Sequence, residues 1–298
     1  MVQRMRRVQC RLSLRRRRVT GTSPVPPCRL GVGLGYRPEF AHDLAGLRAA
    51  VDCIELTVEQ YLNTAPERRE HITEVARTFA VTTHSLELSI GTLEGWDEAY
   101  AEQVVRFAVD VGARWFSDHL CFTRSGATAI GALTPLYRDH RTAALIAERA
   151  ARLQASAGIP FLLENITAHL DVGGDLGEGE FMAEIATAAD CGILLDLANL
   201  SINAQNHGHD PHPYLETFPL DRVVEIHLAG GVSEDGVAYD THSRETPAEV
   251  WELLRVVAQE VGIAAVIIER DHDVPTSVAA FEAELAAARR MLREGVPA

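Results

Sequence analysis

Eight short apolar runs, each of strand length, alternate along this chain with longer segments that carry a helical pattern. Strands that alternate with helices in this way form a parallel sheet, and eight such units favour a closed (β/α)8 barrel over an open sheet. No Gly-x-Gly-x-x-Gly sequence follows a run, so the pattern gives no support to a dinucleotide site. The runs are Leu30–Leu34, Cys53–Leu56, Val81–His84, Trp115–Asp118, Phe161–Glu164, Ile193–Asp196, Val223–Leu228 and Ala265–Glu269.

The length of the chain fits one such barrel and a tail. A TIM barrel of this kind needs about 250 residues, so we expect a single catalytic domain over residues 30–298 of the 298. Residues 1–29 are rich in Arg and end in Ser23–Pro27, without the apolar stretch of a secretory signal. We interpret them as a disordered basic tail or as the product of a start codon placed too early. Helical patterns are clearest in Pro66–Phe79, Trp96–Val111, Pro135–Ala157, Thr246–Val261 and Pro275–Leu292.

Composition excludes several classes of function. No apolar run approaches the roughly 18 residues that span a bilayer, so no membrane partner is expected. The formal net charge is −14 although the first 30 residues contain only basic charges, and so acidic a body argues against nucleic acid. The five Cys are too widely spaced for a disulfide framework and suit a reducing cytoplasm. The chain has no Lys, which rules out a Schiff-base lysine.

Residues of the types that bind metals occur at or just after the ends of six of the eight runs. In a barrel these ends meet on one face, where the active site belongs. A buried carboxylate without a partner costs several kcal/mol, and only Arg270 lies directly beside the group, so we predict bound metal. The absence of Cys from the group indicates iron, manganese or zinc. The residues are His84, Asp118, His119, Glu164, Asn165, Asp196, Asn199, His227, Asp240, His242 and Glu269.

The order and spacing of these residues resemble those of the endonuclease IV type of metal-dependent barrel, related to the xylose isomerase-like barrels, except that Asn199 stands where that group has His. A second group shares this Asn, and the chain resembles it over roughly residues 30–290: the multinuclear non-heme iron-dependent oxidative enzymes, which include the oxidase of methanobactin biosynthesis. The chain departs from the pattern of this group in two places. The first strand is often followed by a His, where this chain has Tyr36–Phe40, and the second is often followed by Glu-Asn, where this chain has Glu59-Gln60. The similar segments are Gly31–Leu34, Ile54–Leu56, Thr83–Gly91, Ser117–Leu120, Leu163–Asn165, Leu195–Asn199, Glu225–Gly230 and Asp240–His242.

The second resemblance implies a cofactor and a substrate. Two or three iron ions of mixed Fe(II)/Fe(III) state would use O2 to modify a Cys-containing precursor peptide in RiPP biosynthesis (ribosomally made, post-translationally modified peptides), and a separate partner protein would present the peptide. His84 and His119 would hold one iron, Glu164 would bridge to a second, and a third position would be looser because a neutral amide binds more weakly than an imidazole. The second iron would be completed by Asp196, His227 and Glu269, and the third position would use Asn199, Asp240 and His242.

Three other functions stay open at this point. A zinc- or manganese-dependent phosphodiesterase or abasic-site endonuclease could use the same ligands. A sugar isomerase-like enzyme would use only the ligands of the second iron and Glu164, and a non-catalytic metal-binding protein would need no substrate. The loops Gly173–Gly179 and Gly230–Tyr239 are candidate lids. Candidates for supporting the ligands or contacting substrate are Glu55, Asp118, Asn165, His207 and Arg270.

Overall fold

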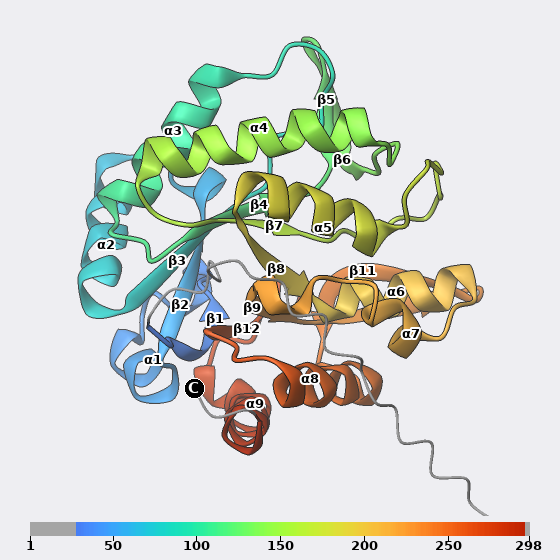
Figure 1. Cartoon of the computed structure of the whole chain (residues 1–298). Helices are drawn as coiled ribbons and strands as arrows, with labels where there is room; N and C mark the ends of the chain where they lie inside the picture. Colours follow the sequence, from blue (N-terminus) through green and yellow to red (C-terminus); the bar gives the residue numbers. More distant parts are fainter. Residues whose placement is uncertain (1–27, 296–298) are drawn as a thin grey trace, which may run out of the picture.

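Eight parallel strands close into a barrel in the computed structural model, which describes residues 28–295 (Figure 1). The strand order around the barrel is β1-β12-β9-β8-β7-β4-β3-β2, and every neighbouring pair is parallel. The predicted (β/α)8 barrel is therefore confirmed. All but the last two residues of the predicted tail lie outside the described residues. The strands are β1 Gly31–Gly35, β2 Cys53–Thr57, β3 Ala80–Ser85, β4 Phe116–His119, β7 Phe161–Glu164, β8 Gly192–Asp196, β9 Val223–Leu228 and β12 Ala265–Ile268.

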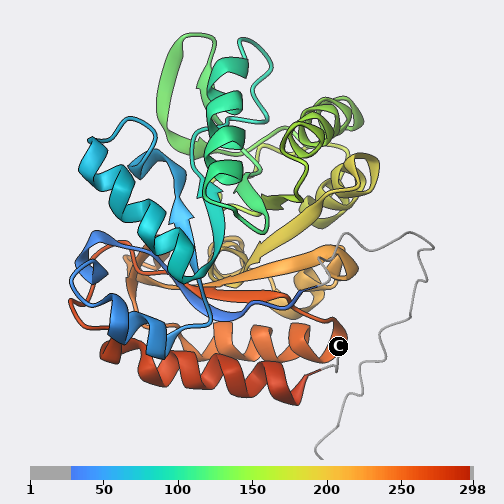
Figure 2. The same ribbon diagram turned by 90° about the vertical axis from the view of Figure 1, so that its left-hand side faces the viewer.

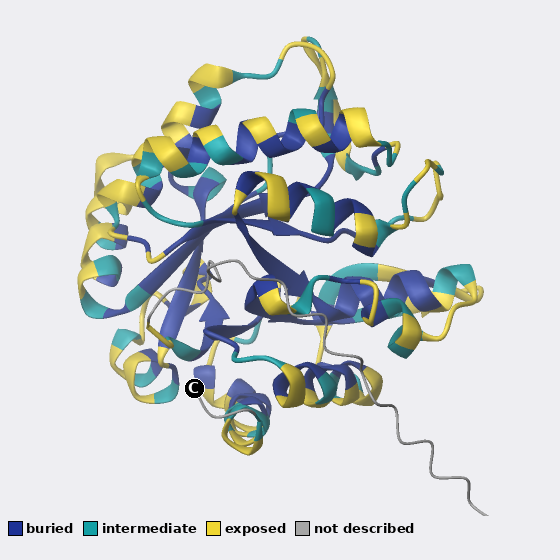
Figure 3. Cartoon of the chain, viewed as in Figure 1, coloured by how far each residue is buried: buried dark blue, intermediate teal, exposed yellow. Residues whose placement is uncertain are grey.

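Helices cover the outside of the barrel, with buried inner faces and exposed outer faces (Figure 3). Helix α4 begins at His140, rather than at Pro135 as the helical pattern predicted, because the Asp139 side chain accepts a hydrogen bond from Thr142 N and caps the helix there. Gly158, at φ 67°, ends it. No helix within residues 28–295 is long and apolar enough to cross a membrane. The α-helices are α1 Leu44–Ala50, α2 Pro66–Thr78, α3 Glu98–Asp110, α4 His140–Ala157, α5 Glu178–Ala189, α6 Leu197–His207, α7 Pro211–Leu215, α8 Ala248–Glu260 and α9 Glu282–Glu294.

Two antiparallel hairpins, which the sequence analysis did not predict, interrupt the strand-helix alternation. The first consists of β5 Phe122–Ser125 and β6 Thr128–Thr134, follows β4, and protrudes from the body of the molecule (Figure 2). The second consists of β10 Gly230–Glu234 and β11 Val237–Arg244 and follows β9. The expectation of a long loop over Gly230–Tyr239 is therefore wrong, since most of that segment pairs with itself. Both hairpins leave the C-terminal ends of barrel strands.

Alternation along the strands carries the polar residues into the barrel. Leu162 and Leu194 belong to a buried apolar cluster. Glu164 and Asp196 follow them two residues later and therefore lie on the same face of their strands. The register places His119 opposite Glu164 in the β4–β7 pair and Asp196 opposite His227 in the β8–β9 pair. The barrel thus has an apolar interior that becomes polar toward the C-terminal ends of its strands.

Candidate metal centre

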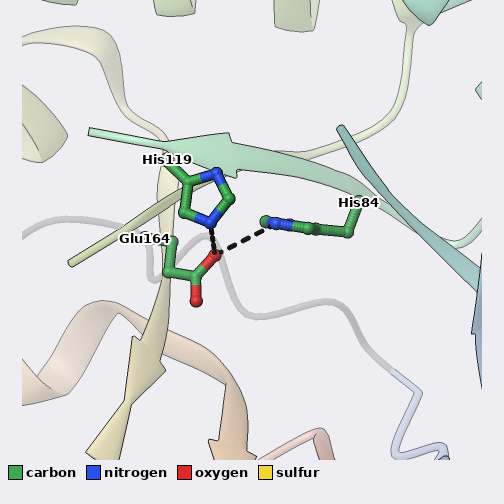
Figure 4. Close-up of side chains that lie close together, drawn as sticks. All are labelled: His84, His119 and Glu164. Carbon is green, nitrogen blue, oxygen red and sulfur yellow. Dashed lines mark ion pairs between the residues drawn. The ribbon is translucent and has the colours of Figure 1, made fainter. Parts of the chain in front are cut away.

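Three strand ends bring two imidazoles to one carboxylate oxygen. His84 Nε2 lies 3.2 Å from Glu164 Oε2, and His119 Nε2 lies 3.5 Å from the same oxygen (Figure 4). The two imidazole rings meet edge to face, with centroids 4.6 Å apart. All three side chains are buried. This arrangement, with one ligand atom from each residue within 4.8 Å of the others, could hold a metal ion.

The hydrogen bonds of Ser117 fix the tautomer of His84. The Ser117 hydroxyl donates to the Thr83 carbonyl at 3.3 Å, and it lies 2.8 Å from His84 Nδ1. Because a hydroxyl has one proton, Ser117 accepts from Nδ1–H and leaves a lone pair on His84 Nε2. Burial lowers the pKa of His119 to about 4 and holds that of His84 well below its usual value. Both rings are therefore neutral and ready to act as ligands at neutral pH.

A second group shares Glu164 with the first. His227 Nδ1 lies 3.4 Å from Glu164 Oε1 and 3.0 Å from Glu269 Oε2. Asp196 uses one oxygen to cap α6, accepting from Asn199 N at 2.7 Å, and its second oxygen has no hydrogen-bond partner. Glu164, Asp196, His227 and Glu269 place their ligand atoms within 4.8 Å of one another. Glu164 therefore has one oxygen for each group.

Two carboxylates lie against the far side of His227, inside the barrel. Glu55 Oε1 is 3.2 Å from His227 Nε2, without the geometry of a hydrogen bond, and its charge favours a proton on Nε2, which would leave Nδ1 to bind metal. Glu225 lies beside this pair and accepts from Trp115 Nε1 at 2.7 Å. Glu55 was among the residues predicted from sequence, whereas Glu225 was not. The signal was present, because Glu225 precedes His227 by two residues in a strand and so shares its face.

A third group lies at the mouth of the barrel. His242 and Asp240 on β11 approach within 2.6 Å (Nε2 to Oδ1), and His242 Nδ1 lies 3.1 Å from Asp271 Oδ2 and 3.4 Å from Glu269 Oε2. Asp271 was not predicted. Asn199 is buried, and its amide oxygen accepts from the Thr167 hydroxyl at 2.6 Å while its nitrogen donates to a backbone carbonyl. The ligand role of Asn199 stays a prediction.

Buried polar atoms without hydrogen-bond partners test whether these residues fit metal ions. Such atoms gather where the three groups meet. They lie close to one another, as Asp240 Oδ1 and His242 Nε2 do at 2.6 Å, but without the geometry of a hydrogen bond, and a hydrogen bond left unmade costs about 1–3 kcal/mol. A cation would satisfy them at once, so the residues present fit a cluster of metal ions. The atoms are Glu164 Oε2, Asp196 Oδ2, His119 Nδ1, both ring nitrogens of His227, Asp240 Oδ1 and His242 Nε2.

Metal binding is expected to weaken as the pH falls. Burial raises the pKa of Glu164 to about 8 and that of Asp196 to about 7, so the metal-free carboxyls are largely protonated below those values. A metal must displace these protons, which lowers its apparent affinity by about tenfold or more per pH unit below 7. Competition against a chromophoric chelator between pH 6 and 8.5, corrected for the chelator's own protonation, measures this slope. A flat profile would contradict the assignment.

Two of the predicted supporting residues point elsewhere. Arg270 donates to Glu284 on α9 at 3.1 Å and lies over the Phe281 ring, so it does not balance the site. Asp118 accepts from Ser85 Oγ at 2.5 Å and Leu88 N at 3.1 Å rather than from the neighbouring imidazole. The reason is the same for both. Consecutive residues of extended chain point to opposite faces, and the candidate ligands are their neighbours, Glu269 before Arg270 and His119 after Asp118.

Asn165 and His207 hold the backbone. Asn165 exchanges two hydrogen bonds with the main chain of Asp196, at 2.8 and 2.9 Å, and so fixes the position of that ligand. His207 ends α6, lies 2.7 Å from the Ala168 carbonyl through Nε2, and is not among the residues that line the cavity below. The loop Gly173–Gly179 is anchored to Arg138, which accepts from Leu176 N and donates to its carbonyl.

The cation beside the centre is Arg37, which the sequence analysis noted only within a departure from the family pattern. Its guanidinium is bonded to Asp271 (Nε to Oδ1 3.1 Å) and lies 4.0 Å from Glu269. Arg37, His84, His119 and His242 line a cavity of about 680 Å³, which also reaches the β5–β6 hairpin. This volume is in the range of ordinary ligand sites. Candidate ligands from all three groups therefore line a cavity large enough for a ligand.

Solved structures place the chain in a fold class. A xylose isomerase domain protein from Planctomyces limnophilus has a TM-score of 0.57 at 15% identity, covering 93% of this chain and all of that one. Endonuclease IV from Thermus thermophilus has a TM-score of 0.56 at 17% identity, covering 89% and 100%. At such identities the likeness concerns the fold alone. The protein is thus a xylose isomerase-like barrel with carboxylates and imidazoles clustered at the C-terminal ends of its strands.

The family follows from sequence comparison. Residues 31–293 match the family described as RiPP precursor modification enzyme MbnB/TglH/ChrH. A UPF0276 protein from Anaeromyxobacter is 35% identical over 248 residues, 83% of this chain and 87% of the relative. Another, from Caulobacter vibrioides, is 33% identical over 247 residues, 82% and 88%. The chain belongs to this family, which confirms the family resemblance carried by the strand-end residues.

Proposed function

We propose that this protein is a multinuclear iron-dependent oxidase that uses O2 to modify a precursor peptide at Cys. The observation that supports this most is the shared carboxylate Glu164, whose Oε2 faces His84 and His119. Its Oε1 faces His227. A carboxylate shared in this way suits two neighbouring metal ions. Imidazoles and carboxylates without thiolate suit iron in either oxidation state.

The residues around the centre would hold, orient and enclose it. Bound iron would supply one-electron redox chemistry with O2. Ser117 lies on Nδ1 of His84 and Glu55 faces Nε2 of His227, so both would favour the tautomers in which the other ring nitrogen binds metal. Asn165 fixes the main chain of Asp196. These contacts pre-organise the ligands, so the centre need not rearrange when metal binds.

The cavity supports a peptide as the substrate. Family membership indicates a RiPP precursor, and a cavity of about 680 Å³ can take a short extended segment rather than a folded protein. Residues 28–295 form the barrel and its two hairpins. We therefore propose that a separate partner protein presents the peptide. Full-rate turnover of free peptide by the isolated chain would exclude that need.

Metal content tests the proposal first. Protein purified without oxygen is expected to contain two or three iron ions by ICP-MS and to give Mössbauer signals of coupled iron when grown on iron-57. Co-expression with small Cys-containing peptides encoded beside the gene is expected to change a peptide's mass only when iron and O2 are present. Zinc or manganese alone, without activity after iron reconstitution, would transfer the assignment to a hydrolytic or isomerase-like reaction.

A further inference from the structure

The β6 strand of the first hairpin has a main chain that is paired on one side only. The two-stranded sheet contains β5 and β6 and nothing else. The other strand, β5, is also tied to the loop after β3, because Ser89 Oγ accepts from Thr123 N at 2.9 Å and Thr92 Oγ1 donates to Arg124 O at 2.9 Å. No such bond joins the main chain of residues 128–133 to another element of the described chain. The outer edge of β6 is therefore open.

A wide bulge turns part of this edge toward the metal centre. Arg124 pairs with Ala129 and Phe122 pairs with Thr134, so four residues of β6 lie opposite a single residue of β5. Gly131, at φ 75°, allows the chain to bend within the bulge. Gly131, Ala132 and Leu133 line the same cavity as the metal-centre imidazoles. Main-chain groups that β5 does not engage therefore lie along the cavity wall.

The composition of β6 leaves this edge unprotected. Natural edge strands are usually protected from pairing by charged side chains or Pro. The sequence Thr-Ala-Ile-Gly-Ala-Leu-Thr contains neither, and its first five residues are exposed, with Ile130 at 44%. An open edge of this kind is a template for another strand. A strand that pairs there would run into the cavity rather than across an outer face.

We propose that β6 receives the precursor peptide as an added strand, which carries its Cys into the cavity of the metal centre. The inference rests on the proposed function for the identity of the peptide. Pairing through the main chain tolerates many side chains, and the cavity wall offers both acidic and basic groups, among them Glu87, Asp240 and Arg68. Recognition at β6 would therefore set where the peptide lies, and not which residues flank its Cys.

Proline in β6 tests the inference. A displayed library of random peptides, each with one central Cys, is first selected on the wild-type protein. Ala132→Pro removes a main-chain donor from the edge and is expected to weaken the selected peptides by about tenfold or more. Ser233→Pro, at an exposed position of β10 outside the cavity, is the control and is expected to retain binding. Equal binding by all three proteins would overturn the inference, as would the failure to select any peptide when proteins encoded beside the gene are also present.

A measurement from the peptide side leaves the protein unchanged. Single N-methylated amides are placed along one selected peptide, and strand addition predicts that affinity falls at every second position. Hydrogen exchange of β6 is expected to slow when the peptide binds. An equal loss of affinity at every N-methylated position would contradict the inference, and so would slower hydrogen exchange only in segments other than β6. If the peptide binds at β6 but its mass does not change with iron and O2, the proposed oxidase function is wrong and the β6 binding surface stands. If the peptide is modified but its affinity does not vary with every second N-methylated position, the β6 surface is wrong and the oxidase function stands.

Discussion

Glu164→Gln is expected to abolish binding of the metal pair and with it any activity of the centre. Among residues 28–295, Glu164 is the carboxylate shared by the first two groups, and an amide cannot offer two anionic oxygens to two cations. Supporting residues alone change metal affinity by about 10–100-fold, so loss of the shared ligand is expected to cost at least about 100-fold. ICP-MS after dialysis and chelator competition measure the loss.

The stability of the metal-free variant separates a ligand role from a structural one. Burial raises the pKa of Glu164 to about 8, so its protonated form, which glutamine resembles in shape, already predominates in the metal-free protein at pH 7. Unfolding of the metal-free variant in urea is therefore expected to match the wild type or exceed it. Glu178→Gln is the matched control, since burial raises the pKa of that carboxyl to about 7 away from the centre. Metal loss in the control, or unfolding of Glu164→Gln, would contradict the ligand role.

The location of the strand-end carboxylates and imidazoles could be predicted from sequence because the alternation along each strand and the closure of the barrel place them on one face. Each apolar run fixes a strand, the strand fixes which residues point inward, and the barrel brings all the ends together. Glu164 and Asp196 needed no further information. Arg270 was placed beside the ligands from its position next to Glu269 in the sequence, whereas alternation turns it to the opposite face, where it donates to Glu284.

The rest of the site depends on contacts that have no local pattern. Arg37 and Asp271 lie 234 positions apart in the chain and meet because β1 pairs with β12 when the barrel closes. The segment of the first hairpin has Gly126 and Gly131 and few buried side chains, so periodicity does not distinguish it from a loop. Tertiary closure decides such features, and sequence patterns carry little information about them.

His227→Ala is expected to destabilise the metal-free protein by about 3–5 kcal/mol, because it leaves buried carboxylates without their partner. His227 is fully buried and lies 3.2 Å from Glu55 and 3.0 Å from Glu269. Glu269 above all holds the pKa of His227 well above its usual value, against the effect of burial. Urea unfolding of the metal-free proteins measures the loss. His209→Ala, in the exposed loop after α6, is the control and is expected to change stability by less than about 0.5 kcal/mol.

The pH dependence of this loss has a definite sign. A histidine whose pKa is raised by folding contributes stability that is complete below about 6.5 and disappears as the pH rises through the folded value. The difference between wild type and His227→Ala is therefore expected to shrink toward alkaline pH. A difference that grows with pH would mean that His227 is neutral in the metal-free protein.

A double variant assigns the loss to particular charges. In the His227→Ala background, Glu55→Gln removes one of the carboxylates left unpaired, so the double variant is expected to be more stable than His227→Ala alone. In the wild-type background the same substitution breaks the 3.2 Å contact and is expected to destabilise. The opposite signs give a coupling free energy of about 0.5–3 kcal/mol. Additive effects would show that Glu55 does not support His227, and the tautomer that leaves Nδ1 free for metal would then need another cause.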